Sequence, residues 1–200
     1  MSTIGTSAPI GLREQKKALT RATIESTALN RFLADGYEAV RLEDLCAECL
    51  VSTRTFFRYF TSKEDLVLGR LRSHLLLAEK LLADRPAKEP GLLWLRAVIA
   101  AVATDYAAEP ERELVRLRLT AATPALGAGV GLVFAGFDGL VWRFAAARWH
   151  AEEDTRGPRL LAAAAVAAFK AGLDMWVADD ARSDLGGIVT ANLDDLSRDW

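Results

Sequence analysis

The sequence predicts an all-α protein of two domains, and three observations support this. Hydrophobic residues make up 51% of the 200 residues, and most of the aliphatic ones are Ala and Leu, which favour helix. Five of the six prolines, at positions 86, 90, 110, 124 and 158, fall between stretches with helical spacing. We find no run with the apolar–polar alternation of a strand. We therefore expect helices joined by loops.

Charge is divided unevenly along the chain, although the net charge is only −2. Residues 1–72 carry 11 Lys and Arg against 9 Asp and Glu, whereas the rest carries 14 against 18. The sign of this asymmetry agrees with an N-terminal part that binds DNA. The N-terminus has no apolar run of the kind found in signal peptides, so we expect a cytoplasmic protein.

The first helix is expected over residues 13–35, with Ile24, Ala28, Phe32 and Leu33 as its apolar stripe. Gly36 then suits a helix end that requires a positive φ. The early turns of this helix are basic. Their cations either touch the DNA backbone or form an ordinary solvated face: Arg13, Lys16, Lys17 and Arg21.

A second helix over 43–49, a turn over 50–52 and a short helix over 53–59 give the helix-turn-helix arrangement. Ser52 is the expected N-cap of the short helix. Phe56 and Phe60 share one face and should attach this helix to a scaffold, which leaves a cationic, aromatic face for the major groove of DNA. The expected base contacts are Thr53, Arg54, Thr55, Phe57 and Arg58; the expected phosphate contacts are Arg41, Ser52, Tyr59 and Lys63.

A fourth helix is expected over 63–83, with Ser62 as its N-cap and Asp65 completing a capping box. Lys63 lies where the helix dipole disfavours a cation, so a bound phosphate would explain it better than a solvated position. A rigid helix of this length would act as a lever between a ligand site and DNA.

Cys46 and Cys49 form a lone C-x-x-C inside the second helix, beside Leu42 and Leu45. We interpret them as core residues, because a redox pair prefers a helix start after a strand and no second cysteine pair completes a zinc site. The only histidines are His74 and His150. We therefore expect no catalytic residues, no metal and no cofactor, and thus not an enzyme.

Five segments together resemble the TetR family of bacterial transcription regulators. They are Gly36-Tyr37-Glu38-Ala39, Leu42-Glu43-Asp44-Leu45, Val51-Ser52, Thr55-Phe56-Phe57-Arg58-Tyr59-Phe60 and Ser62-Lys63-Glu64-Asp65-Leu66. The resemblance implies a homodimer that binds a palindromic operator, usually as a repressor. Its helix-turn-helix domain would cover residues 13–62. A ligand-binding and dimerisation domain over 63–200 would release the DNA.

Two residues depart from the pattern of this family. Leu50 stands where the family usually has Gly in the turn. A positive φ at a residue other than glycine costs about 1 kcal/mol, so we expect the turn to differ slightly from the family's. Arg41 stands where the family tends to have Ser or Thr, so the second helix loses its usual N-cap and Arg41 is free to reach a phosphate.

After a loop at 84–91, further helices are expected over 92–108, 111–122, 126–153, 159–178 and 183–197. Residues 125–149 are very apolar, but Asp138, Arg143 and Arg148 argue against a membrane span, and we expect no membrane partner. Gly127, Gly129 and Gly131 follow no strand, so they leave space rather than bind a nucleotide. The large residues that line this space or pack in the core are Trp94, Phe134, Phe137, Trp142 and Phe144.

Residues 113–119 and 123–126 resemble the C-terminal domain of the TetR subgroup that includes mycofactocin-type regulators. That resemblance implies a small hydrophobic or amphipathic ligand, with an acyl-CoA-like molecule as the first to test. Arg116 and Arg118 are two apart on a helix, so only one can face inward; Arg118 is our candidate for an anionic head group. Helices 159–178 and 183–197 either form the homodimer interface or pack within one chain.

Two other functions fit the same residues. A ligand-independent DNA-binding protein would keep the helix-turn-helix but show no small-molecule effect on DNA release. A small redox protein using Cys46 and Cys49 would show a thiol of low pKa and a bound chromophore.

Overall fold

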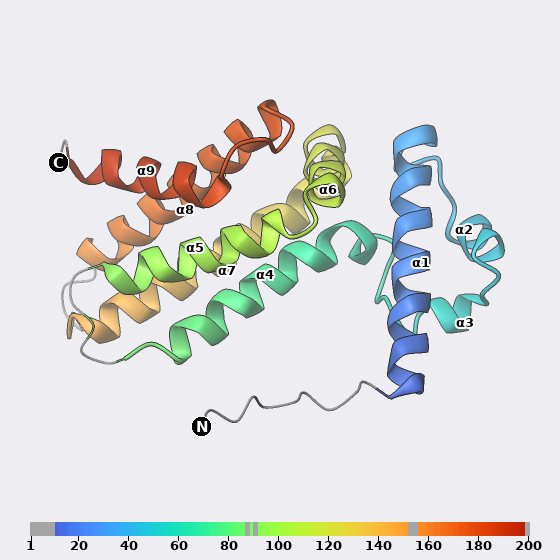
Figure 1. The fold of residues 1–200 in the computed structure, drawn as a ribbon, viewed down its shortest axis with the longest axis horizontal. Coiled ribbons are helices and arrows are strands. Elements are labelled where there is room, and N and C mark those ends of the chain that lie inside the picture. The colour runs from blue at the N-terminus through green and yellow to red at the C-terminus, as the bar shows by residue number, and fades with distance from the viewer. Residues whose placement is uncertain (1–10, 87–88, 90–91, 152–155, 199–200) are drawn as a thin grey trace, which may run out of the picture. The chain divides into compact units, whose positions relative to one another are not determined.

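In a computed structural model the described residues, 11–86, 89, 92–151 and 156–198, form nine α-helices and no strand (Figure 1). This confirms the all-α prediction. The chain divides into two compact units, residues 1–66 and residues 67–200, and each is described here by itself. The division falls after the second residue of the fourth helix, whereas the sequence placed the domain boundary after residue 62.

The N-terminal unit contains α1 (Leu12–Asp35), α2 (Leu42–Glu48), α3 (Thr53–Phe56) and the first residues of α4 (Asp65–Ala83). Its core is a small apolar cluster to which every helix contributes. Gly36 ends α1 with φ +85°, as expected for glycine at this position. The largest fully buried side chains of this unit are Ile24, Phe32, Leu45, Phe56, Phe60 and Leu66.

The C-terminal unit contains the rest of α4 together with α5 (Leu93–Ala107), α6 (Pro110–Ala122), α7 (Pro124–Arg148), α8 (Arg156–Ala178) and α9 (Leu185–Arg198). Helix α8 packs on α7 and α9, and α5 packs on α9. In Figure 1, α5 and α7 run between α4 on one side and the α8–α9 pair on the other. Helix α5 is therefore apolar on several faces, as a central helix must be.

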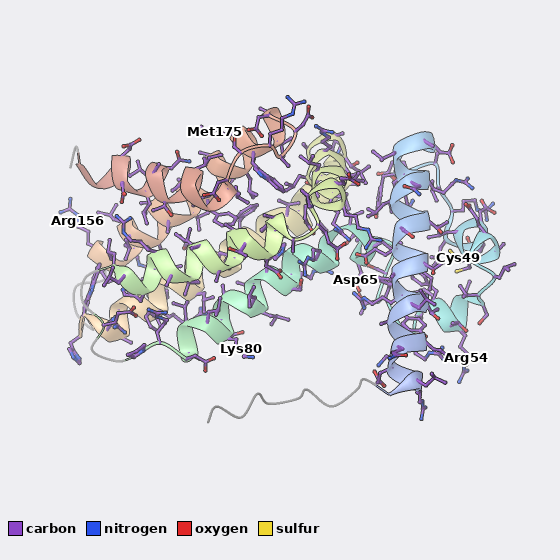
Figure 2. All side chains as sticks on the ribbon, viewed as in Figure 1. Cys49, Arg54, Asp65, Lys80, Arg156 and Met175 are labelled. Carbon is purple, nitrogen blue, oxygen red and sulfur yellow. The ribbon has the colours of Figure 1, made fainter. Side chains whose placement is uncertain are left out.

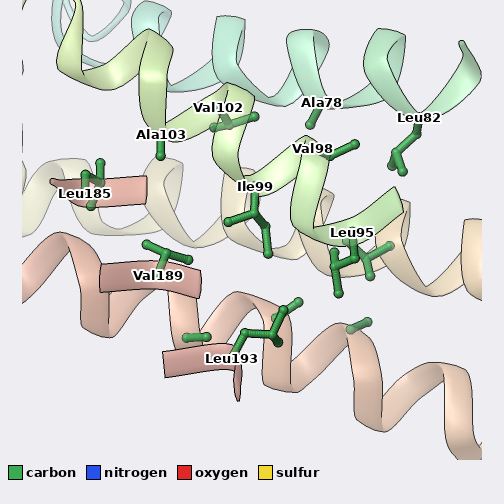
Figure 3. Packing of buried hydrophobic residues seen from close by; sticks show 14 of the residues in the cluster. Ala78, Leu82, Leu95, Val98, Ile99, Val102, Ala103, Leu185, Val189 and Leu193 are labelled. Atoms are coloured by element: carbon green, nitrogen blue, oxygen red, sulfur yellow. The ribbon is translucent and has the colours of Figure 1, made fainter. Parts of the chain in front are cut away.

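Figure 3 shows how α5 divides its apolar side chains between two neighbours. Leu95 and Ile99 of α5 point toward Leu193 and Val189 of α9. Val98 and Val102 of α5 point toward α4, near Ala78. Leu95 and Ile99 are four residues apart, as are Val98 and Val102, so the members of each pair lie one above the other on successive turns. The same cluster continues through the alanines of α8.

Helices α8 and α9 approach closely at Gly172. A Cβ added there would lie 2.4 Å from Cγ2 of Val189, which is closer than packed atoms can come. Asn192 Nδ2 donates to the Ala168 carbonyl across the same contact at 3.1 Å. The small residues of α8 thus serve packing within the chain at this point.

Several helix ends differ from the sequence prediction; α8, for example, begins at Arg156 rather than at 159. Helix α3 ends at Phe56 rather than at 59, because the next residues form tighter turns. Helix α4 begins at Asp65 rather than at 63. Helix α7 ends at Arg148 rather than at 153, and His150, two residues after this end, has φ +51°. Residues 152 and 153 of the expected α7 lie outside the described residues.

Helices α7 and α8 are long and apolar enough, by length and composition, to cross a membrane. This is weak evidence, because core helices of soluble proteins have the same character. Here Val141 and Ala145 of α7 and Ala162, Ala165 and Ala168 of α8 belong to the core of the C-terminal unit.

Candidate nucleic-acid interface and ligand cavities

The segment from residue 53 to 59, called here the recognition segment, is held at its start by Ser52. The Ser52 hydroxyl accepts a hydrogen bond from the Thr55 backbone N–H at 3.1 Å and lies 3.0 Å from the Thr55 hydroxyl. The Ser52 carbonyl accepts from the Phe56 N–H at 2.9 Å. The predicted N-cap is therefore confirmed.

Two buried rings attach the recognition segment to the N-terminal unit. Phe56 and Phe60 are both buried, and their ring centroids lie 5.4 Å apart in a stacked pair. Between them, Tyr59 N–H donates to the Phe56 carbonyl at 2.8 Å, so the backbone winds more tightly than an α-helix. Phe57 points outward and is 56% exposed. The predicted division between anchoring and exposed aromatic side chains is confirmed.

The outer face of the segment is polar and cationic. Thr53, Arg54 and Arg58 are exposed, Thr55 is partly buried, and Figure 2 labels Arg54 at α3. Arg58 Nη2 donates to the Tyr59 hydroxyl at 3.2 Å, and this contact lowers the pKa of Tyr59. These two side chains therefore form a unit with fixed donors, which suits phosphate or base-edge recognition.

Arg21 has a specific structural task that its sequence pattern did not single out. Its Nη1 donates to the Tyr59 carbonyl at 2.9 Å, and its guanidinium lies 4.6 Å from the centre of the Phe60 ring. Arg21 thus joins α1 to the end of the recognition segment. A contact across 38 residues leaves no local periodic signal in the sequence.

Lys63 and Arg41 flank the recognition segment in the chain. Lys63 Nζ lies 4.4 Å from the centre of the Tyr37 ring, and burial lowers the pKa of Lys63. Arg41 is exposed, and its Nε lies 3.9 Å from Oε2 of Glu43. As expected, α2 has no side-chain cap at Arg41.

The turn between α2 and α3 contains a strained residue, whereas the sequence predicted only that this turn would differ slightly from the family's. Leu50 takes φ +54° and is 94% exposed, so no packing of its side chain offsets the backbone cost. The Val51 N–H donates to the Cys46 carbonyl at 3.0 Å and closes the turn. Cys46 is buried and Cys49 partly buried, and both are free thiols. Burial raises the pKa of Cys46, which is opposite to what a reactive thiol needs.

The C-terminal unit holds an apolar cavity of about 50 Å³ between α4, α5, α7 and α8. Two of the predicted ligand residues, Phe134 and Phe137, line it. Every other lining residue is also apolar. They are Ala78, Leu82, Leu95, Val98, Ile99, Val102, Leu140, Val141, Ala165, Val166 and Phe169.

A larger groove of about 300 Å³ lies between α6, α7 and α8, with Lys170 and Asp174 at its border. Next to it is an inner cavity of about 40 Å³, which reaches Val67 and Leu71 of α4. The groove and the inner cavity share Leu117, Thr120, Val130 and Phe134 as walls. Phe134 borders all three spaces, so its ring separates the apolar cavity from the other two.

The remaining predicted ligand residues do not line these three spaces. Trp94 is fully buried against Phe144, with ring centroids 4.8 Å apart. Trp142 lies beneath the guanidinium of Arg159 at 4.2 Å. Arg118 is about half exposed and pairs with Asp180 at 2.5 Å. Of the two arginines compared in the sequence, Arg116 is the one that faces inward.

A group of ionisable side chains, called here the ion cluster, consists of Arg70, His74, Asp105, Glu113 and Arg116. His74, Glu113 and Arg116 are buried, and Arg70 and Asp105 are partly exposed. Glu113 Oε1 lies 2.9 Å from Arg116 Nη1 and 3.2 Å from Arg70 Nε. Arg70 Nη2 lies 2.9 Å from Asp105 Oδ2, and His74 Nε2 lies 3.1 Å from the same oxygen. The cluster therefore joins α4 to α5 and α6.

His74 is fully buried and stacks on Tyr106, with ring centroids 3.7 Å apart. Burial, aided by the nearby Arg70, lowers the pKa of His74 to about 4 despite the contact with Asp105. The imidazole is therefore neutral near pH 7. The cluster was not predicted from the sequence, because its members come from three helices. The one local signal is the i, i+3 pair of Glu113 and Arg116.

Metal binding has no support in the part of the chain that the structure describes. No group of three or more His, Cys, Asp or Glu side chains there has the geometry to hold an ion.

Comparisons with known proteins agree with this geometry. Residues 24–69 match the model of bacterial regulatory proteins of the tetR family, and residues 91–200 match that of the MftR C-terminal domain. The chain is 33% identical over 171 residues to the HTH-type transcriptional regulator TcmR of Streptomyces glaucescens, covering 80% of this chain and 73% of TcmR.

It is 26% identical over 190 residues to a Mycobacterium tuberculosis protein named as the mycofactocin biosynthesis regulator MftR, covering 92% of this chain and 96% of that protein. Among solved structures it is similar to FadR of Bacillus subtilis in complex with stearoyl-CoA, with a TM-score of 0.61 and 17% identity. That match covers 88% of this chain and 97% of FadR and concerns the fold alone.

Proposed function

Because the chain belongs to the tetR family of bacterial DNA-binding transcription regulators, we propose that it is a ligand-responsive homodimeric repressor. It acts in the cytoplasm on a palindromic operator. The recognition segment enters the major groove, and a small molecule bound in the C-terminal unit releases the DNA. The observation that carries this proposal is the exposed cationic face of residues 53–59, held by buried Phe56 and Phe60.

Base recognition is assigned to Thr53, Arg54, Thr55, Phe57 and Arg58, and phosphate contact to Arg41, Ser52, Tyr59 and Lys63. The cap on Thr55 and the Arg58–Tyr59 contact support this, because both fix side chains before DNA arrives. The stacking of Lys63 on Tyr37 likewise limits the freedom of its ammonium group.

The homodimer is assigned to α8 and α9. Helix α8 exposes an apolar stripe that includes Leu160, Ala163, Ala167, Ala171 and Met175. These residues recur every three or four positions, and such a continuous stripe favours an isologous contact with its copy in a second subunit. Ala167→Glu should shift the protein toward monomer in analytical ultracentrifugation, whereas Lys80→Glu, exposed on α4, should not.

The ligand is assigned to the groove and the cavities around Phe134. Their walls are mostly apolar, and the groove alone reaches the size of small-molecule sites, about 300 Å³ or more. A hydrophobic or amphipathic molecule fits such walls. The Bacillus subtilis FadR structure, which shares the fold, is a complex with stearoyl-CoA, so an acyl-CoA-like ligand is the first to test.

Release is assigned to a shift of α4. This helix carries Val67 and Leu71 at the inner cavity and Ala78 and Leu82 at the apolar cavity. A ligand can act only through different affinities for the DNA-bound and DNA-free arrangements. Operator DNA must therefore weaken ligand binding by the same factor as ligand weakens DNA binding.

The proposal is tested by selecting bound sequences from random DNA with the parent, Arg54→Ala and Arg58→Ala. Loss of a bidentate base contact should cost about 1–3 kcal/mol and relax the preference at one position of each half-site. Lys63→Ala should instead weaken all sequences alike and flatten the salt dependence by about 1 per subunit. Lys80→Ala is the charge-matched control. A selection that yields no preferred sequence with the parent would contradict the operator assignment.

A further inference from the structure

The inner cavity has a buried polar wall that the proposed function does not use. Glu113 and Arg116 are only 2% and 5% exposed, and they line this cavity together with Tyr106 and Thr120. Buried ions are rare in helical domains because removing them from water costs several kcal/mol each. Their position in the inner cavity, next to the groove, indicates a role in selecting the part of a ligand that enters this cavity.

The charges of the ion cluster balance. Its two guanidinium groups, Arg70 and Arg116, face two carboxylates, Asp105 and Glu113, at distances from 2.9 to 3.2 Å. His74 adds no charge near pH 7, because its pKa is lowered to about 4. A carboxylate or ammonium group brought into this cavity would therefore be buried without a counter-charge.

Neutral hydrogen-bonding groups remain available at the same wall. The Thr120 hydroxyl donates to the Leu117 carbonyl at 2.8 Å and keeps its lone pairs as acceptors. Burial raises the pKa of Tyr106, so its phenol stays protonated. A ligand hydroxyl or carbonyl can use such partners without disturbing the balance of charges.

We propose that the inner cavity selects the uncharged hydrogen-bonding end of the ligand, such as a hydroxyl, ketone or ester group, while the apolar body lies in the groove against Phe134. This inference rests on the proposed function, because it names the chemistry of the same ligand. Any charged part of the molecule stays at the open side of the groove, near Lys170. The selected end also contacts α4 through Val67 and Leu71, which places recognition on the helix assigned to DNA release.

The test uses the full-length protein at pH 7.5 and the neutral fluorescent probe N-phenyl-1-naphthylamine. Decan-1-ol and decanoate, matched in chain length, displace the probe, and the ratio of their displacement constants is measured. Glu113→Gln leaves the cluster with one excess positive charge, so the ratio should shift toward decanoate by about tenfold or more. Glu111→Gln makes the same charge change on the exposed side of α6 and should shift the ratio by less than about twofold.

A second pair of variants leaves every ion in place, and it decides the matter should Glu113→Gln not fold by circular dichroism. Thr120→Val removes the hydroxyl in the inner cavity and should weaken decan-1-ol by about fivefold. Thr104→Val is its control, because Thr104 makes the same type of hydrogen bond, to the Ala100 carbonyl at 2.8 Å, on an exposed face of α5.

The two ways to fail separate cleanly. If the probe binds and both decyl compounds displace it, but Glu113→Gln shifts the ratio no more than Glu111→Gln, only the selection by charge is wrong. An unchanged decan-1-ol affinity in folded Thr120→Val would show that the inner cavity does not bind the hydroxyl end of the ligand, and would overturn this inference while leaving the proposed function intact. If neither the probe nor either decyl compound binds, the amphipathic ligand of the proposed function is wrong as well, and this inference with it.

Discussion

The two units of this protein use charged side chains in opposite ways. In the N-terminal unit the side chains of Arg54 and Arg58 are exposed to solvent, and Arg58 donates a hydrogen bond to the Tyr59 hydroxyl. In the C-terminal unit Glu113 and Arg116 are buried and paired with each other. Exposed cations cost little and remain available to phosphate, whereas buried ions persist only when their geometry is good. The cations of the recognition segment are therefore exposed to solvent, whereas those of the ion cluster are paired with carboxylates.

The largest loss of stability should come from replacing Phe56, whose buried ring attaches the recognition segment to the N-terminal core. Phe56→Ala removes a fully buried ring from the small N-terminal core and should lower the free energy of unfolding by about 3–5 kcal/mol. Its neighbour provides the control: Phe57→Ala, at a side chain that is 56% exposed, should change stability by less than about 0.5 kcal/mol. Urea unfolding measures both. Equal losses of stability would mean that both Phe56 and Phe57 attach the recognition segment to the N-terminal core.

Two arginines of α6, Arg116 and Arg118, allow a buried ion pair to be compared with a half-exposed one. Arg116→Gln removes a cation that contacts the buried Glu113 carboxylate and should destabilise the protein by about 3 kcal/mol. Arg118→Gln breaks the half-exposed pair with Asp180 and should cost less than about 1 kcal/mol. Both are measured by urea unfolding at one ionic strength. A small loss for Arg116→Gln would show that the ion cluster is hydrated rather than buried.

The share of the structure that could be predicted from the sequence also differs between the two units. Ser52, Phe56 and Phe60 were each assigned their structural roles correctly, because caps and helical spacing act over a few neighbouring residues. The end of α3 was set too late, since the tighter winding after Phe56 depends on the packing of Phe60. The contacts of these residues with DNA stay predictions.

In the C-terminal unit the order of the helices could be predicted, but the cavity walls could not. Phe134 and Phe137 line the cavities described above whereas Trp94, Trp142 and Phe144 do not line those cavities, and nothing local distinguishes these five aromatic residues. The choice between Arg116 and Arg118 depended on the rotation of α6 about its axis, and α6 contacts α4 through the Arg70–Glu113 pair. Contacts between distant segments of this kind cannot be read from spacing.

Acid should weaken the C-terminal unit through His74. Its pKa is about 4 in the folded chain and about 6.5 when unfolded, so the unfolded chain binds the proton more readily between these values. Stability should therefore fall as the pH drops from about 6.5 toward 4, by at most about 1.4 kcal/mol per pH unit from this group. His74→Phe keeps the stacking on Tyr106 and should remove that share of the slope.

The measurement is the free energy of unfolding against pH for the parent, His74→Phe and His150→Gln. His150 is exposed, and its replacement should leave the slope as in the parent. Comparing variants at each pH removes the contribution of ionisable groups that do not contact His74, whereas Asp105 lies 3.1 Å from its Nε2 and is affected by the replacement. Parallel curves for the parent and His74→Phe would mean that the buried imidazole accepts a proton without cost.

The smallest effect compares backbone strain in the two units. Leu50 in the N-terminal unit and Ala181 in the C-terminal unit both have a left-handed φ, +54° and +59°. Leu50→Gly should stabilise the protein by about 0.5 kcal/mol, because relief of about 1 kcal/mol is partly offset by the greater freedom of glycine in the unfolded chain. Ala181 packs against the main core, so Ala181→Gly also loses a buried methyl group worth about 0.8 kcal/mol and should give no gain.

Leu50→Ala completes the comparison. Its backbone stays strained and its side chain was 94% exposed, so its stability should remain within about 0.5 kcal/mol of the parent. A gain for Leu50→Ala equal to that for Leu50→Gly would point to the exposed leucine side chain, not to φ, as the source of the cost. DNA affinity gives an independent measure of the same turn. Ser52 and the ring of Phe56 fix the recognition segment after it, so Leu50→Gly should leave operator affinity within about twofold while stability rises.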